Sequence, residues 1–80
     1  MHEQIIPRLT LIIRPHQEVG LKLDHFDEAL CDLLKGKLDQ ICAALPNANS
    51  KQLVATIAYK LLKELPGLEI VVKDDSTSNN

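Results

Sequence analysis

Hydrophobic and polar residues alternate along three short stretches of this chain. In residues 8–14 every second residue is apolar and its side chain falls on the same face, which predicts a strand that Pro15 ends. Residues 68–73 alternate in the same way and predict another strand. Residues 18–23 also alternate, but Gly20 falls in their middle, so this stretch is either a strand that completes a hairpin or a loop.

Two longer stretches repeat their apolar residues with the period of a helix instead. The first runs from residue 26 to residue 45 and predicts an amphipathic helix with Asp24 as its N-cap. The second carries apolar residues over 53–65, and Asn49 followed by Gln52 forms a capping signature in front of it. The connection between these helices is short, so we expect them to be antiparallel neighbours.

The order of these elements is strand, candidate strand, helix, helix, strand. It predicts an α+β fold, a two-layer α/β sandwich in which an antiparallel helical hairpin packs on one face of a two- or three-stranded sheet. Residues 1–73 form one domain, and the polar residues 74–80 are expected to be a disordered tail. The pattern leaves the strand order open, because the last strand can pair parallel to the first or antiparallel to the second.

Composition narrows the classes of function. The chain has 80 residues, a formal net charge of −2 and a pI near 5.8. So short a chain builds a marginal core, which favours a second subunit. The near balance of charges and the presence of only two aromatic residues, Phe26 and Tyr59, count against nucleic-acid binding.

Chemical motifs are absent from the sequence. His16 and His25 stand in no metal-binding spacing, and no phosphate-binding glycine loop or nucleophile motif occurs. Cys31 and Cys42 fall in one predicted helix, roughly 16 Å apart, which is too far for a disulfide. We therefore expect no metal, no cofactor and no catalysis. Reduced thiols and the lack of a signal or membrane segment predict a cytoplasmic protein.

The sheet face opposite the helices is the first candidate site. Helices on one face leave the other without a covering layer, and apolar side chains there favour a subunit interface. The alternation assigns six candidate residues to this face: Arg8, Thr10, Ile12, Arg14, Val71 and Lys73.

The outer surface of the second helix is the other candidate. Four residues gather there by helical spacing: Thr56, Tyr59, Lys60 and Lys63. A tyrosine among lysines suits an acidic partner, although its ring can equally pack along the helix.

These features together favour a small protein-interaction or regulatory module, a homo-oligomer, most simply a dimer, formed through its sheet face. The alternative is a nucleic-acid-binding regulatory module that uses the basic residues of the same face or of the second helix. The sequence does not identify the partner.

Overall fold

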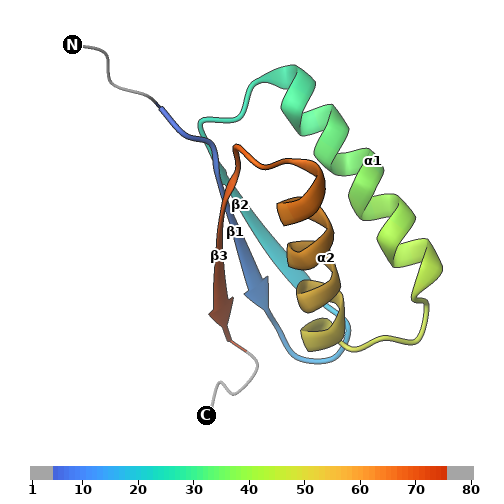
Figure 1. Cartoon of the computed structure of the whole chain (residues 1–80). Helices are drawn as coiled ribbons and strands as arrows, with labels where there is room; N and C mark the ends of the chain where they lie inside the picture. Colours follow the sequence, from blue (N-terminus) through green and yellow to red (C-terminus); the bar gives the residue numbers. More distant parts are fainter. Residues whose placement is uncertain (1–4, 76–80) are drawn as a thin grey trace.

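A computed structural model describes residues 5–75 of the chain. It contains strand β1 (Arg8–Ile13), strand β2 (Val19–Asp24), helix α1 (Glu28–Ala44), helix α2 (Ser50–Glu64) and strand β3 (Glu69–Asp74). Both helices lie on the same side of the sheet (Figure 1). The expected α+β sandwich is therefore confirmed, and the second stretch of alternation forms a strand rather than a loop, although it covers 19–24 instead of 18–23.

The sheet has the strand order β2-β1-β3, so β1 is its centre. β2 pairs with β1 antiparallel, and β3 pairs with β1 parallel, which settles the order that the pattern left open. β3 is the last strand in sequence, and the hairpin strand β2 and both helices form the connection between β1 and β3. Parallel neighbours require such a long crossover.

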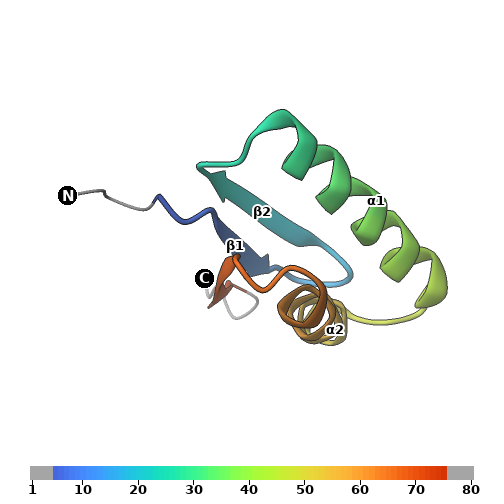
Figure 2. The ribbon, with the colours of Figure 1, turned by 45° about the horizontal axis from the view of Figure 1, so that its top comes forward.

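The core lies between β1 and the helices. Leu9 and Leu11 of β1 are fully buried, and they meet Leu34 of α1 and Ile57 and Leu61 of α2. α2 packs against all three strands, whereas α1 packs against α2. In the turned view α1 lies farther out, on the β2 side of the molecule (Figure 2). The helix layer is therefore centred on α2.

The N-terminus of α1 differs from the expectation. Asp27, not Asp24, is the N-cap, and its Oδ1 accepts a hydrogen bond from the backbone N–H of Leu30 at 2.7 Å. Asp24 is instead the last residue of β2, where it pairs with Arg8. His25 then turns the chain with a positive φ of 63°. The helix can begin only after this turn, so Phe26 packs on the core from outside the helix.

The start of α2 is as the sequence predicts. The Asn49 side chain accepts from the backbone N–H of Gln52, and the Gln52 side chain accepts from the backbone N–H of Asn49, which completes a capping box. Two orphan donors of the first turn are thereby satisfied.

The strand boundaries differ from the pattern by one residue, since β2 begins and ends one residue later than predicted and β3 begins at Glu69 rather than at Leu68. β1 ends at Ile13, because Arg14 already belongs to the turn that Pro15 begins. β3 extends beyond the expected domain boundary at Lys73: Asp74 is a strand residue, and the N–H of Asp75 donates to the carbonyl of Ile13 at 2.7 Å. The rest of the expected tail, 76–80, lies outside the described residues.

Candidate functional site

The face of the sheet opposite the helices carries the side chains predicted for it. Three rows cross this open face from β2 over β1 to β3. Arg8 lies between Asp24 and Glu69, Thr10 lies between Lys22 and Val71, and Ile12 lies between Gly20 and Lys73. The register thus brings together the predicted residues of β1 and β3 and adds Lys22 and Asp24 from β2.

The first of these rows is acidic in balance. Arg8 pairs with Glu69, with 3.2 Å between Nε and Oε1, and both side chains are half exposed. Asp24 stands on the other side of Arg8 in the register. Two carboxylates therefore flank one guanidinium, so the basic residues of the open face do not form one continuous patch.

The centre of the open face is more shielded than the alternation predicts. Thr10 is only 6% exposed, and Ile12 and Val71 are half-buried. Arg14 supplies part of the cover: a Cβ placed on Gly20 would lie 2.7 Å from its Nε and 3.0 Å from its Nη2. Gly20 thus leaves room for the guanidinium, and the apolar part of the face is a narrow strip of two residues.

Two exposed apolar side chains lie on the helix side of the sheet, and the sequence pattern does not show that they are exposed. Leu21 of β2 and Val72 of β3 are 44% and 48% exposed although both point to the helix side. They belong to the two edge strands, which a helix layer centred on α2 does not fully cover. Periodicity assigns a side chain to a face, but it carries no information on how wide the opposite layer is.

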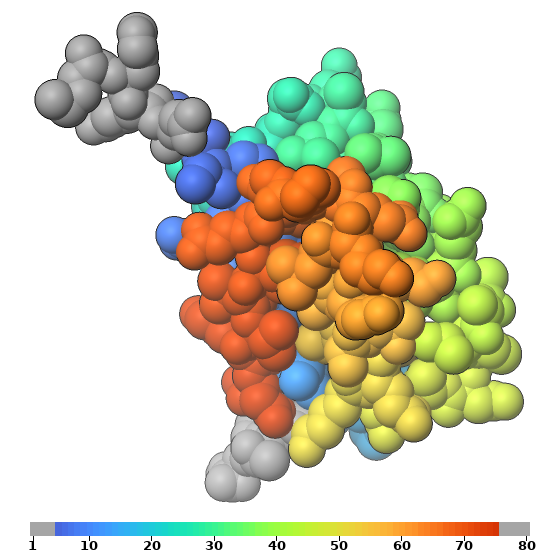
Figure 3. Space-filling model, viewed as in Figure 1, coloured from blue at the N-terminus to red at the C-terminus, as the bar shows by residue number. Residues whose placement is uncertain are grey.

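The four candidate residues of α2 separate into two pairs. Tyr59 is exposed at the outer surface, and Lys63 places its Nζ 5.2 Å from the centre of the ring, within the range of a cation–π contact. Thr56 and Lys60 instead line a cleft between α2 and α1. The space-filling view shows α2 flanked by β3 on one side and by α1 on the other (Figure 3).

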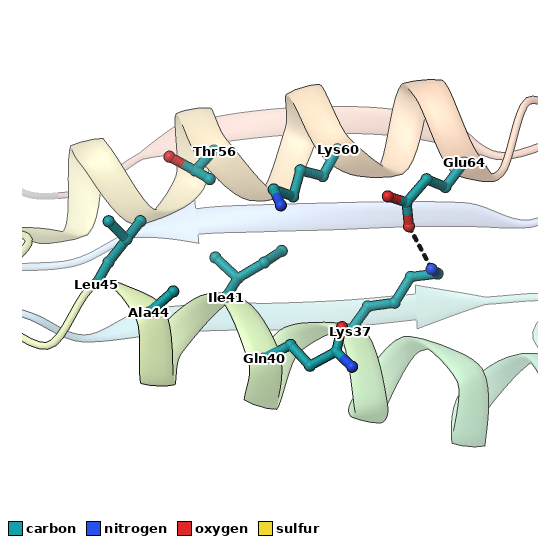
Figure 4. Close-up of a pocket in the computed structure, with 8 residues that line it drawn as sticks. All are labelled: Lys37, Gln40, Ile41, Ala44, Leu45, Thr56, Lys60 and Glu64. Carbon is teal, nitrogen blue, oxygen red and sulfur yellow. Dashed lines mark hydrogen bonds and ion pairs between the residues drawn. The ribbon is translucent and has the colours of Figure 1, made fainter.

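This cleft has a volume of about 270 Å³. Its floor on the α1 side is apolar, and polar side chains stand along its walls. The eight lining residues are Lys37, Gln40, Ile41, Ala44, Leu45, Thr56, Lys60 and Glu64 (Figure 4).

An ion pair closes one end of the cleft. Lys37 Nζ of α1 donates to Glu64 Oε1 of α2 and so links the two helices. The hydrogen bond and the charge of Lys37 lower the pKa of the Glu64 carboxyl, and the charges of Lys60 and Lys63 add to this effect. Glu64 is therefore held as a carboxylate.

Lys60 stands over the middle of the cleft. Its ammonium group has no hydrogen-bond or ion-pair partner among residues 5–75, and the carboxylate of Glu64 is engaged by Lys37. The Thr56 hydroxyl donates to the carbonyl of Gln52 at 2.9 Å, which leaves its oxygen lone pairs as acceptors. Two ammonium groups and one carboxylate give the cleft a net positive charge of one unit.

Signals for the cleft existed in the sequence. Thr56, Lys60 and Glu64 follow one another at intervals of four residues, which places them on one face of a helix. Periodicity does not show that Glu64 pairs with Lys37, because Lys37 lies on the other helix, 27 residues away in the sequence.

The other chemistry-bearing residues form no cluster. Within the described range, no three His, Cys, Asp or Glu side chains stand close enough to hold a metal ion. Cys31 and Cys42 are both free thiols. Neither helix of the part described is long and apolar enough to span a bilayer.

Comparison with known proteins returns nothing: no protein-family model, no curated protein and no solved structure matches this chain.

Proposed function

We propose that this protein is a non-catalytic protein-interaction module that associates with a second copy of itself through the open face of its sheet. The observation that carries the proposal is the distribution of charge in the three rows of that face. Acidic side chains lie at one end of the strands, beside Arg8, and basic ones lie toward the other, beside Ile12.

This charge distribution becomes complementary to itself when two copies stack their open faces about a two-fold axis that lies parallel to the sheets and perpendicular to the strands. Such an axis lays β1 of one copy antiparallel on β1 of the other, and a centre at Thr10 sets the Arg8 row against the Ile12 row. Glu69 of each copy then faces Lys73 of the other. Asp24 faces Gly20, the position over which the guanidinium of Arg14 lies.

Symmetry repeats each of these contacts, so the arrangement holds four opposite-charge contacts around a centre of Thr10 and Val71. Lys22, at the β2 end of the central row, faces Lys22 of the other copy, and this one like-charge contact lowers the affinity. Two stacked sheets cross at about 30° rather than lying in perfect alignment. Arg14 and Lys73 have long side chains, so they can still reach the carboxylates of the other copy at this angle. Complementary charge of this kind fixes the register of association more than its strength.

The size of the face limits the affinity. Three strands of six residues each present a footprint of about 300 Å² per copy, below the about 800 Å² per partner of a stable interface. We therefore propose a weak dimer that forms and dissociates with concentration, as suits a regulatory module.

Nucleic acid is the less favoured partner for the same face. Asp24 and Glu69 flank Arg8 and would meet the phosphate backbone with like charge. We also propose a reducing compartment such as the cytoplasm, where the thiols of Cys31 and Cys42 stay free.

Sedimentation velocity from about 5 µM to about 500 µM tests the proposal, since this range brackets weak association. We expect the wild type to shift from monomer toward dimer as its concentration rises. Val71→Glu should remain monomeric at all concentrations, because Val71 faces its own copy across the two-fold axis and the two new carboxylates repel each other. Ile12→Lys should do the same, because residue 12 faces Arg8 of the other copy and the new ammonium group meets a like charge.

Val72→Glu is the matched control, because Val72 follows Val71 in β3 but points to the helix side of the sheet. It should dimerise like the wild type. A wild type that stays monomeric, or a Val72→Glu variant that alone loses association, would refute the sheet-face dimer. Circular dichroism of each variant verifies that it is folded.

A further inference from the structure

We propose that the cleft between α1 and α2 binds a small carboxylate with a short aliphatic tail, a medium-chain fatty acid being the simplest example. The cleft opens between the two helices, on the opposite side of the molecule from the sheet face that we propose for dimerisation. The two proposals are independent of each other.

The floor of the cleft suits the tail of such a ligand. Ile41 is buried, and Ala44 and Leu45 continue the apolar surface along α1. A volume of about 270 Å³ corresponds to about nine water-sized groups of about 30 Å³ each. A chain of seven or eight carbons with its carboxylate fills about this space.

The polar groups of the cleft suit the carboxylate. Lys60 reaches into the cleft from α2 with no partner of its own in the described part of the chain (Figure 4). The amide group of Gln40 stands on the opposite wall and can donate a second hydrogen bond. A charged donor over an apolar floor is the usual composition of a site for an amphiphilic anion.

The charge of the cleft selects a monoanion. Lys37 is engaged by Glu64, so one positive charge is left for a ligand. A dianion such as a phosphate monoester would bring its second charge near the Glu64 carboxylate, and an alkylammonium ion would meet Lys60 directly. Both should bind more weakly than a monocarboxylate.

Octanoate titrated into the isotope-labelled protein, followed by two-dimensional NMR, tests this proposal. We expect saturable shift changes at Ile41, Ala44, Leu45 and Thr56. For a ligand of this size in a half-open cleft the Kd should be about 1 mM. Octanol and octylammonium have the same tail without the negative charge, and we expect each to bind at least about fivefold more weakly.

Two substitutions with matched controls assign the site. Lys60→Gln should weaken octanoate binding about fivefold to tenfold, whereas Lys51→Gln, at the other end of the same helix and outside the cleft, should leave it unchanged. Ala44→Leu should fill the floor and abolish binding. Ala43→Leu adds the same volume outside the cleft and should not.

Three results would overturn the proposal. Equal affinity for octanoate and octanol would show that the tail alone binds, on any apolar surface. Shift changes centred on Leu21 or Val72, with no loss in Lys60→Gln, would place the ligand at the sheet edges. A short acidic peptide that displaces octanoate and binds more tightly than it would show that the cleft holds a side chain of a partner protein rather than a free ligand.

Discussion

The Ser50 hydroxyl donates a hydrogen bond of 2.5 Å to the backbone carbonyl of Arg14, so the first residue of α2 is joined to the turn of the β-hairpin. The backbone N–H of Ser50 donates to the carbonyl of His16 in the same turn, at 3.1 Å. Ser50 is buried, and these two bonds hold the helix to the sheet although 36 residues separate Ser50 from Arg14.

Removing this hydroxyl should destabilise the fold. In Ser50→Ala the backbone bond to His16 persists, but the carbonyl of Arg14 loses its side-chain partner, which costs about 1–2 kcal/mol of unfolding free energy. Urea denaturation measures the loss. Ser50→Thr keeps the hydroxyl and should recover part of it, whereas a loss below about 0.3 kcal/mol in Ser50→Ala would mean that water replaces the bond.

Neighbouring leucines of α1 offer a second test, because they differ in burial and not in type. Leu34 is 1% exposed and Leu33 is 46% exposed. Leu34→Ala should lower the unfolding free energy by about 2–5 kcal/mol, since it opens a cavity in the core. Leu33→Ala should change it by less than about 0.5 kcal/mol. Similar losses for the two variants would contradict the orientation of α1.

The sequence patterns predict most of this fold, because alternation and helical periodicity each depend on local geometry. The capping box of Asn49 and Gln52 is local as well, and it is correct. Asp24 misled the prediction of the first helix since two aspartates three residues apart both suit an N-cap. Only the pairing of Asp24 with Arg8 in the sheet decides between them.

The candidate surfaces were harder to predict for a physical reason. The open face follows from alternation, so Thr10, Ile12 and Val71 lie where expected. Their degree of burial does not follow, since it depends on side chains such as Arg14 that reach across the register. The cleft likewise needs both helices to be placed in three dimensions.

The ion pair between Lys37 and Glu64 predicts a measurable titration. Lys37 lowers the pKa of Glu64 in the folded state, first through its hydrogen bond and then through its charge. The pair therefore adds stability above the unfolded-state pKa of this glutamate, and that stability is lost as the pH falls through the lower folded-state pKa.

Carbon-detected NMR of the Glu64 carboxyl measures this effect. Lys37→Gln should raise the pKa of Glu64, and Lys60→Gln should raise it by a smaller amount because Lys60 acts through charge alone. Lys35→Gln also removes a lysine of α1, but Lys35 does not contribute to the shift, so Glu64 should titrate as in the wild type. An unchanged titration in Lys37→Gln would show that the pair does not persist in solution.

Reversal of charge on β3 tests the geometry of the proposed dimer most directly. In the two-fold arrangement Glu69 of each copy faces Lys73 of the other, so Glu69→Lys and Lys73→Glu each create two like-charge contacts. Each should weaken dimerisation about tenfold at low salt. The double variant Glu69→Lys/Lys73→Glu restores opposite charges across the interface and should recover most of the affinity.

Asp32→Lys on α1 is the control for this experiment, because it changes the net charge as Glu69→Lys does but lies outside the sheet. It should leave the dimer unaffected, and sedimentation at about 50 mM and about 500 mM salt should show the single-variant effects shrinking as ions screen them. Failure of the double variant to recover would exclude this register even if the sheet face is the interface, because rescue requires that residues 69 and 73 meet across the two-fold axis.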